Sequence, residues 1–216
     1  MRPWHTFEDR GSYISRPMPD RTANSLPAAY FDHLYQEYAD PWSFATSEYE
    51  SAKYDATLAA LPRARYQSAL EIGCSIGVLT GRLAARCLKL LAVDISEIAL
   101  GRARQRCASM VNVRFEQLAV PDVFPDEAFD LIVLSEVGYY WSRADLDRAR
   151  GLIVGHLESG GHALLVHWTP PVADYPLTGD EVHRSFLRAA HNDSGIRHIF
   201  GRVEPTYRLD LFAGEW

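Results

Sequence analysis

Short apolar segments alternate with helical patterns over most of this 216-residue chain, and this alternation limits its fold more than any other feature. The first four segments are apolar on both faces, as parallel strands covered by helices on either side must be. A chain of this kind is expected to fold as an α/β protein with a doubly wound, mostly parallel, Rossmann-like sheet. Seven strands are predicted, at residues 68–73, 88–94, 113–117, 129–137, 162–168, 197–203 and 206–212.

The helices between these strands have start signals of their own. Ser96 is a predicted N-cap, and Glu97 behind it places a negative charge at the positive end of the helix dipole. Two other starts have the spacing of a capping box: Ser142 with Asp145, and Thr178 with Glu181. Helices are therefore predicted at 77–86, from 96 onward, at 142–157 with a stop at Gly160 and Gly161, and at 178–190.

Two segments precede the first strand. Residues 1–25 mix Pro, Arg, Asp, Ser and Gly without an apolar period, which predicts a flexible N-terminal tail. Residues 28–61 are helical and aromatic, and Pro41 divides them because the residue before a proline avoids the helical conformation. We therefore expect one domain over residues 26–216 that begins with two helices, and we interpret these helices as a lid over a bound ligand.

Charge and composition argue against several classes of function. A net charge of −6 disfavours nucleic acid as a partner, since binding a phosphate backbone relies on clustered Lys and Arg. No run of 18 apolar residues is present and the first residues lack the apolar core of a signal peptide, so we expect no membrane span and a cytoplasmic location. The three cysteines show no CxxC spacing and the eight histidines no HExxH spacing, so no metal site is expected.

Two glycines at the end of the first strand point to a ligand site. In "ALEIGCSIG", Gly73 allows a sharp turn and Gly77 allows the next helix to begin close to a ligand, with main-chain N–H groups facing outward. Glu71 precedes this turn and would repel a diphosphate but suit an ammonium group. Asp94 ends the second strand, where a carboxylate can bind the two hydroxyls of a ribose. An ammonium, a ribose and no pyrophosphate together describe S-adenosylmethionine (SAM).

At this point the sequence resembles a known family. The stretches "ALEIGCSIG", "LLAVDIS" and "FDLIVLSEV" are similar to motifs of class I SAM-dependent methyltransferases. "YADPWSFATSEYESAKYDATLAALP" and "SEVGYYW" resemble the nodulation protein S group, which N-methylates the sugar amine of a deacetylated chitooligosaccharide, and bacterial methyltransferases associated with PIG-L-type deacetylases. The resemblance covers about residues 28–212. It implies SAM as cofactor, S-adenosylhomocysteine (SAH) as product, an amino sugar or glycan as acceptor, and a functional link to a deacetylase.

The resemblance also assigns cofactor contacts by position. It implies that Gly73, Cys74, Ser75 and Gly77 line the methionine end of SAM, that Glu71 lies near its amino group, that Asp94 lies at its ribose, and that Ile95 is a further cofactor contact. Many members of the class have an Asp after the third strand to accept the adenine amino group. This chain has Leu118 and Ala119 there, so main-chain atoms are expected to contact the base.

Residues for the methyl acceptor are expected at the ends of the fourth and fifth strands. Ser135, Glu136, Tyr139 and Tyr140 follow strand four and are expected to face the reactive end of the cofactor, with Ser135 as a cofactor contact and Tyr139 as a catalytic candidate. Glu136 is our candidate for orienting or deprotonating the acceptor; a purely structural carboxylate is the alternative. His167 is a candidate base, with a hydrogen-bonding role as its alternative. In the lid, Trp42, Tyr54 and Lys53 are expected near the cofactor, and packing on the sheet edge is the alternative.

The sequence therefore favours a methyltransferase that acts on an amine, or else a hydroxyl, of a small glycan-like molecule. Three other functions stay open: a small-molecule O-methyltransferase, a SAM-binding protein without turnover, and a nucleotide-dependent oxidoreductase, which the missing third glycine disfavours. The oligomeric state does not follow from the sequence.

Overall fold

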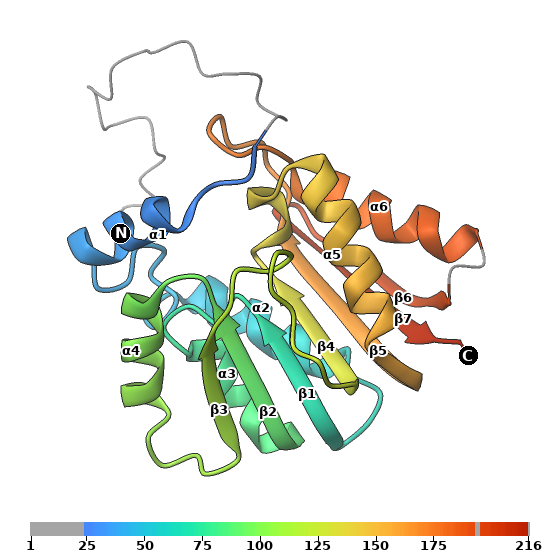
Figure 1. The fold of residues 1–216 in the computed structure, drawn as a ribbon, viewed down its shortest axis with the longest axis horizontal. Helices are drawn as coiled ribbons and strands as arrows, with labels where there is room; N and C mark the ends of the chain where they lie inside the picture. The colour runs from blue at the N-terminus through green and yellow to red at the C-terminus, as the bar shows by residue number, and fades with distance from the viewer. Residues whose placement is uncertain (1–23, 193–194, 216) are drawn as a thin grey trace.

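The predicted strands form one sheet in the computed structural model, which describes residues 24–192 and 195–215 (Figure 1). The strand order is β3-β2-β1-β4-β5-β7-β6, and β7 is the only strand of the described sheet that runs antiparallel to both of its neighbours. The doubly wound, mostly parallel prediction is therefore confirmed. The strands are β1 (Tyr66–Ile72), β2 (Cys87–Asp94), β3 (Val113–Gln117), β4 (Phe129–Ser135), β5 (Leu157–Trp168), β6 (Ile196–Val203) and β7 (Tyr207–Gly214).

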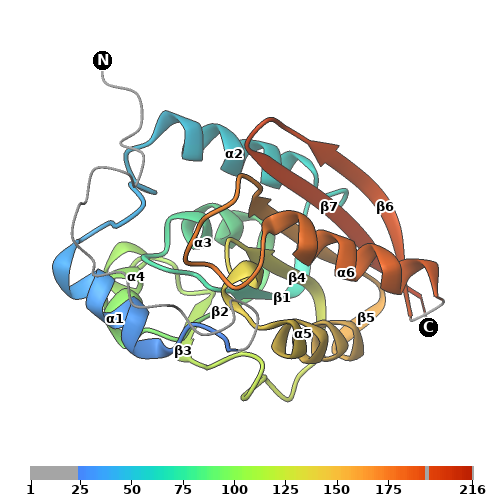
Figure 2. The ribbon, with the colours of Figure 1, turned by 90° about the horizontal axis from the view of Figure 1, so that it is seen from above.

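Helices cover both faces of this sheet. Figure 2 shows α2 and α3 on one side and α5 on the other. The helices are α1 (Ala28–Glu37), α2 (Glu48–Ala59), α3 (Val78–Leu83, continued by the 3-10 turn η2, Ala84–Arg86), α4 (Glu97–Arg106), α5 (Arg143–Gly155) and α6 (Gly179–His191), and a 3-10 turn, η3, spans Gly138–Tyr140.

Alternate side chains of each central strand enter two separate cores. On β4, Ile132 and Leu134 pack in the core beneath α5 and α6, whereas Leu131 and Val133 pack in the core beneath α2 and α3. All four are 1% exposed or less. This period of two explains why the central strands are apolar at nearly every position: a parallel strand with helices on both faces has no solvent face.

The predicted helix starts are present. The Ser96 hydroxyl accepts the Ala99 N–H, and the Ser142 hydroxyl accepts the Asp145 N–H. Thr178 and Glu181 form a complete capping box, in which each side chain accepts the other residue's main-chain N–H. Each cap satisfies a donor at a helix N-terminus that has no partner inside the helix.

The predicted stop of the helix at 142–157 by Gly160 and Gly161 is wrong. Helix α5 ends at Gly155, and both glycines lie inside β5. They occupy an irregularity where the pairing of β5 with β4 shifts register between Phe129 and Leu131. A Cβ on Gly161 would lie 2.9 Å from the Glu158 carbonyl oxygen, so the glycine reflects close backbone packing within the sheet.

The aromatic N-terminal segment forms two helices on either side of Pro41, as predicted, with residues 38–47 between them. Most of the expected tail, residues 1–23, lies outside the described residues. Ser25 belongs to the predicted tail and nevertheless has partners: its hydroxyl accepts the Ser142 N–H at 2.8 Å and donates to Asp145. The next residue, Leu26, donates its N–H to the Tyr140 carbonyl oxygen at 2.9 Å.

The topology creates a crevice beside β1. Chain connections run in opposite directions from β1, toward β2 and β3 on one side and toward β4 and β5 on the other. In open α/β sheets, ligands bind beyond the carboxyl ends of the strands at such a switch point. The ends of β1, β2 and β4 therefore define where a site is expected.

The packing around Gly77 leads to a test of the fold. Gly77 has φ +79°, and a Cβ there would lie 3.0 Å from the Ala103 Cα of α4. Gly77→Ala should therefore lower the free energy of unfolding by at least ~1–2 kcal/mol, the cost of a left-handed alanine alone. Gly101, an exposed α4 glycine at which an added Cβ would have no atom within 4 Å, is the matched control. Gly101→Ala should raise stability by ~0.5–1 kcal/mol. Urea unfolding measures both, and equal effects would contradict this account.

Candidate active site

A cavity that is partly open to solvent lies at the carboxyl ends of β1, β2 and β4, and its empty space, including the part open to solvent, is about 920 Å³. Leu26, which precedes α1, also lines it, and helix α1 and the 38–47 segment contribute Phe31, Tyr35, Trp42 and Phe44 to its wall. Most sequence-predicted cofactor residues also line it: Trp42, Tyr54, Glu71, Gly73, Cys74, Ser75, Asp94, Ile95, Leu118 and Ser135, together with the acceptor candidate Glu136. Gly77, Ala119, Tyr139 and His167 are not among its lining residues.

Glu71 is a buried carboxylate with unused hydrogen-bonding capacity. Its side chain lines the cavity and is 1% exposed, and within the described residues its Oε2 has no hydrogen-bond partner. Burial raises the pKa of Glu71 to about 7; the Thr80 hydroxyl opposes this shift, although it lies outside hydrogen-bond geometry. A buried polar oxygen of this kind is costly without a partner. Glu71 is therefore suited to a ligand with a cationic donor.

Asp94 organises the glycine turn. Its Oδ2 accepts the Ser75 N–H at 2.8 Å and its Oδ1 accepts the Ser96 N–H at 2.9 Å. Burial raises the pKa of Asp94 to about 6, although these main-chain donors act in the opposite direction. Both oxygens retain a further lone pair. The carboxylate can thus hold the turn in shape and still accept hydrogen bonds from a ligand.

The two glycines of the turn serve packing as well as any ligand. A Cβ on Gly73 would lie 2.0 Å from Val137 Cγ2, and a Cβ on Gly77 would meet Ala103 of α4. The expectation that Gly77 makes room for a ligand is therefore replaced by a different cause, the close approach of α3 and α4. Gly73, Cys74 and Ser75 still present main chain to the cavity.

Helix α1 closes over this turn through hydrogen bonds that the sequence patterns do not predict. The Tyr35 hydroxyl lies 2.5 Å from Ser75 Oγ, and Ser96 Oγ donates to Asp32 at 2.6 Å. From α4, Arg102 donates to the carbonyl oxygens of Tyr35, Tyr38 and Ala39 at the end of α1. Phe31 and Tyr35 are four residues apart in a helical pattern and therefore lie on the same face of α1. This spacing indicates which face of α1 packs against the protein, but it does not identify the hydrogen-bond partners.

The wall expected to contact a base is mainly apolar. Leu118 and Val120 line the cavity together with Ile95. The Leu118 N–H donates to the Asp94 carbonyl oxygen and the Ala119 carbonyl oxygen accepts the Val123 N–H, so both groups already have partners. Stacking between Ile95, Leu118 and Val120 is the interaction that this wall offers most directly to an aromatic ring.

Glu136 is at the centre of a buried polar cluster. Its Oε1 accepts from Lys53 Nζ at 2.6 Å, and its Oε2 accepts from the Tyr139 hydroxyl at 2.5 Å and the Trp168 N–H at 2.9 Å. Lys53 also binds Glu50 Oε1 at 3.0 Å. Burial alone would lower the pKa of the Lys53 ammonium, but the carboxylates of Glu136 and Glu50 outweigh it and raise that pKa.

This cluster changes two expectations. Lys53 was expected near the cofactor, but it is not among the residues that line the cavity and it pairs with two carboxylates of the protein. Tyr139 is buried and acts on Glu136 through its hydroxyl, whereas Tyr140 lines the cavity. The pair Lys53–Glu136 joins α2 to the end of β4, so the second lid helix is fixed to the sheet by a buried ion pair.

His167 lies behind the 138–140 turn, away from the cavity. It has no exposed surface, and its Nε2 accepts the Gly138 N–H at 3.1 Å. Burial, reinforced by His183 and Lys53, holds the pKa of His167 well below its usual value. The ring nitrogen that would act as a base is thus already in use. This arrangement favours the hydrogen-bonding alternative over the catalytic one.

Metal and membrane features are absent from residues 24–192 and 195–215. No cluster of three His, Cys, Asp or Glu side chains there could hold a metal ion. No helix of this part of the chain is long and apolar enough to cross a bilayer. Cys74, Cys87 and Cys107 are free and buried.

Comparisons with known proteins agree with this architecture. The family model of nodulation protein S (NodS) matches residues 31–165. Nodulation protein S of Rhizobium tropici is 32% identical over 57% of this chain and 52% of that protein. Nodulation protein S of Sinorhizobium fredii is 31% identical over 65% of this chain and 67% of that protein.

A solved structure shows the same fold. N-methyltransferase NodS from Bradyrhizobium japonicum, in complex with SAH, superposes with a TM-score of 0.74 over 84% of this chain and 96% of that chain, at 23% identity. The chain spans only about half the length of the first curated relative. The family model nevertheless matches more than half of this chain, from α1 through most of β5. The chain belongs to the nodulation protein S family.

Proposed function

We propose that this protein is a SAM-dependent N-methyltransferase that acts on an amine of a small amino sugar or glycan. The observation that supports this most strongly is the pair of buried carboxylates, Glu71 and Asp94, in one cavity beside the glycine turn. A dinucleotide would bring a diphosphate toward these two anions at a high electrostatic cost. A ligand with an ammonium and a ribose instead supplies the donors that they lack.

The residues present fit SAM in both charge and shape. Glu71 Oε2 is free to accept from the amino group of SAM, and the remaining lone pairs of Asp94 are free to accept from ribose hydroxyls. Ile95, Leu118 and Val120 offer an apolar wall for adenine. When bound, SAM supplies an electrophilic methyl group on a sulfonium. The rings of Tyr35, Trp42 and Tyr140 line the same cavity and suit a cation near their faces.

The lid helices supply water exclusion and alignment. Helix α1 is joined to the glycine turn by Tyr35 and to the N-cap of α4 by Asp32, and α2 is joined to the end of β4 by Lys53. In-line methyl transfer requires the acceptor lone pair to be held at near-attack distance, and a closed, dry site supports this alignment. The fixed lid therefore assigns α1 and α2 a role in orientation.

The acceptor end of the site is formed around Glu136. Its side chain lines the cavity and is 12% exposed, which allows a hydrogen bond from an incoming amine to a free lone pair. The positive charge of Lys53 balances the negative charge of Glu136 in this ion pair. Glu136 orients the amine by accepting a hydrogen bond from it while the nitrogen attacks the methyl group. Trp168, Tyr49 and Tyr207 cluster next to it with ring centroids 6.2 to 6.4 Å apart, and aromatic faces suit a sugar ring.

A second shallow groove lies between α2 and the β6–β7 pair. Tyr49, Lys53 and Tyr207 line it together with Arg202 and Glu204. The mixture of aromatic and polar groups fits an oligosaccharide better than an apolar metabolite. An acetylated sugar nitrogen is an amide and a poor nucleophile, so a deacetylase acting beforehand would supply the substrate.

The choice of acceptor can be tested directly. With SAM present, the purified protein should methylate glucosamine and chitooligosaccharides that have a free amine. The fully N-acetylated oligosaccharides, which retain their hydroxyls, should give no product because their amide nitrogen lacks a reactive lone pair. Mass spectrometry of the products measures both. Methylation of the acetylated glycans or of phenols instead would identify an O-methyltransferase, and SAM binding without any product would indicate a protein without turnover.

The cofactor site has its own test, independent of the acceptor. Asp94→Asn should weaken SAH binding by tenfold or more, about 1.4 kcal/mol, because an amide is a weaker acceptor for two hydroxyls. Titration calorimetry gives the dissociation constants. Asp122→Asn is the control, since Asp122 is an exposed residue that pairs with Arg148 on the surface. An unchanged affinity in Asp94→Asn would contradict the ribose assignment.

The pH dependence of binding follows from Glu71. In the free protein its pKa is about 7, and a cationic amino group beside it favours the carboxylate. Binding should therefore release a proton below pH 7, and SAM affinity should rise by up to about tenfold per pH unit from pH 6 to 7. Glu71→Gln should flatten this rise. Calorimetry in buffers of different ionisation enthalpy counts the released protons. A wild-type slope that persists in the variant would exclude Glu71 as its source.

A further inference from the structure

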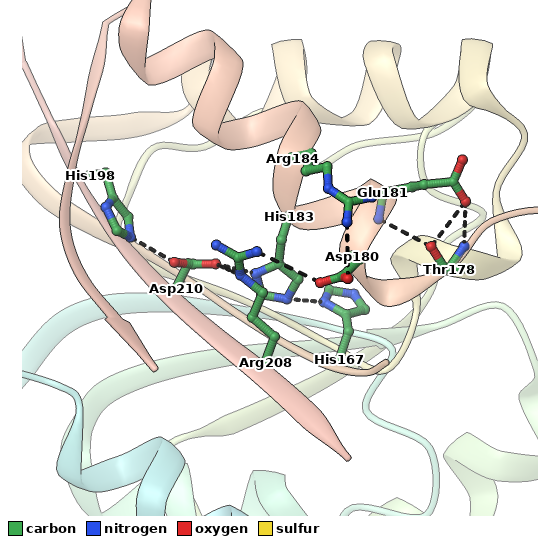
Figure 3. Close-up of polar contacts among 9 residues, drawn as sticks. All are labelled: His167, Thr178, Asp180, Glu181, His183, Arg184, His198, Arg208 and Asp210. Carbon is green, nitrogen blue, oxygen red and sulfur yellow. Dashed lines mark hydrogen bonds and ion pairs between the residues drawn. The ribbon is translucent and has the colours of Figure 1, made fainter. Parts of the chain in front are cut away.

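Three buried side chains form a continuous line of hydrogen bonds behind the site (Figure 3). His167 Nδ1 lies 3.1 Å from His183 Nε2, and His183 Nδ1 lies 2.6 Å from Asp210 Oδ2. At the other end, the Gly138 N–H donates to His167 Nε2 at 3.1 Å. None of the three side chains is more than 1% exposed. We call this set, His167, His183 and Asp210, the relay.

The hydrogen bonds of the relay have one direction. A main-chain N–H is always a donor, so His167 Nε2 must be the acceptor and its proton must lie on Nδ1. That proton is donated to His183 Nε2, which places the His183 proton on Nδ1, next to Asp210. Burial lowers the pKa of both rings, for His183 against the opposing effect of Asp210, so both imidazoles are neutral at pH 7. Each tautomer is fixed by its neighbour.

Asp210 is the charged end of the relay. Burial alone would raise its pKa, but hydrogen bonds from His183 and Arg208 outweigh this effect and lower it. Arg208 Nε donates to Oδ2 at 2.6 Å, and His198 Nε2 lies 2.7 Å from Oδ1 (Figure 3). Asp210 is therefore ionised and fully surrounded by donors, as a buried carboxylate must be.

Three glycines lie close to the relay. A Cβ on Gly201 would lie 2.7 Å from Asp210 Oδ1, its nearest atom. A Cβ on Gly138 would meet Val182 Cγ1 at 2.6 Å before His167 Nε2 at 3.1 Å, and a Cβ on Gly179 would meet the Trp168 carbonyl oxygen at 2.2 Å before His167 Cβ at 2.9 Å. These glycines belong to the η3 turn, helix α6 and strand β6. The backbone is therefore closely packed around the relay, and at Gly201 a relay atom is the first that a side chain would meet.

The relay ends at the turn that supports the acceptor site. Gly138 stands between Glu136 and Tyr139, and the Tyr139 hydroxyl donates to Glu136 Oε2. The next residue, Tyr140, lines the cavity. A shift of the Gly138 peptide would thus move both the carboxylate and an aromatic wall of the site. The relay residues also lie beyond residue 165, where the match to the family model ends.

We propose that His167, His183 and Asp210 are positioning residues, which hold the Gly138 amide and thereby fix Glu136 and Tyr140 for methyl transfer. The orientation of the acceptor is the part that rests on the proposed function. The hydrogen-bonded relay itself does not depend on it. Glu136 touches the acceptor, and the relay acts on Glu136 through the turn.

The first measurement uses the wild-type protein. Two-bond proton–nitrogen NMR spectra of the histidine rings identify which ring nitrogen holds the proton. The relay requires the Nδ1–H tautomer for both His167 and His183 at pH 7. An Nε2–H tautomer or an imidazolium at either ring would overturn it.

The second measurement compares two variants of similar size. In His183→Gln, the side-chain oxygen can accept from His167 while its NH₂ donates to Asp210, so the direction of the relay is preserved. His183→Met removes both bonds. Amide hydrogen exchange at Gly138 should accelerate at least tenfold in His183→Met and stay within threefold of wild type in His183→Gln. An unchanged Gly138 exchange rate in a folded His183→Met would contradict the proposal. If this variant does not fold, the wild-type tautomers and the His183→Gln exchange rate decide.

Steady-state kinetics then test whether the relay positions Glu136 for methyl transfer or only stabilises the fold. With a free-amine glycan, His183→Met should lose at least tenfold in kcat while its SAH dissociation constant stays within twofold, and His183→Gln should recover kcat. Equal kcat in the two variants would refute the positioning role. If the wild-type protein methylates no amine, the proposed function fails, whereas the tautomers and the exchange rates still decide whether the relay exists.

Discussion

The burial of carboxylates at the ends of adjacent parallel strands is the constraint on which this structure depends. Glu71 and Asp94 come from neighbouring strands whose ends meet at one edge of the sheet, and desolvation raises the pKa of both. The fold partly satisfies Asp94 with main-chain donors and leaves one oxygen of Glu71 without a partner among the described residues. A site with this imbalance suits a cationic ligand with hydroxyl groups. We therefore expect Asp94, which shapes the glycine turn, and Glu71 to favour such a ligand.

A second buried charge system links the lid to the chemistry. Lys53 neutralises Glu136, and its position on α2 ties this helix to the end of β4. Removing only one partner of a buried pair leaves an uncompensated charge, so this link is far more sensitive to change than a surface ion pair. On the opposite side of Glu136, the relay supports the turn through Gly138. The carboxylate is thus held from two directions, by helix α2 and by the C-terminal third of the chain.

The helices and strands of the fold could be predicted from local sequence patterns. The contacts within the candidate site could be predicted only in part. Apolar runs identified each strand, and Ser96, Ser142 and Thr178 marked real helix starts, because these signals act within a few residues. Gly160 and Gly161 led to a wrong prediction since a glycine in a tight strand pairing and one at a helix end look alike in sequence. The glycine turn and Asp94 were found because their spacing is set by one strand–helix–strand unit. The partners of Lys53 and His167 were missed because Glu136, His183 and Asp210 are brought to them by tertiary packing that no local period records.

Arg102 has a consequence for the timing of turnover. One guanidinium on α4 satisfies three carbonyl groups at the end of α1, so α1 is attached to α4 by charge-assisted hydrogen bonds. Any outward movement of α1 would break these bonds together. We therefore expect α1 to move as a unit with α4, and we expect loss of Arg102 to shorten the residence time of a bound nucleoside.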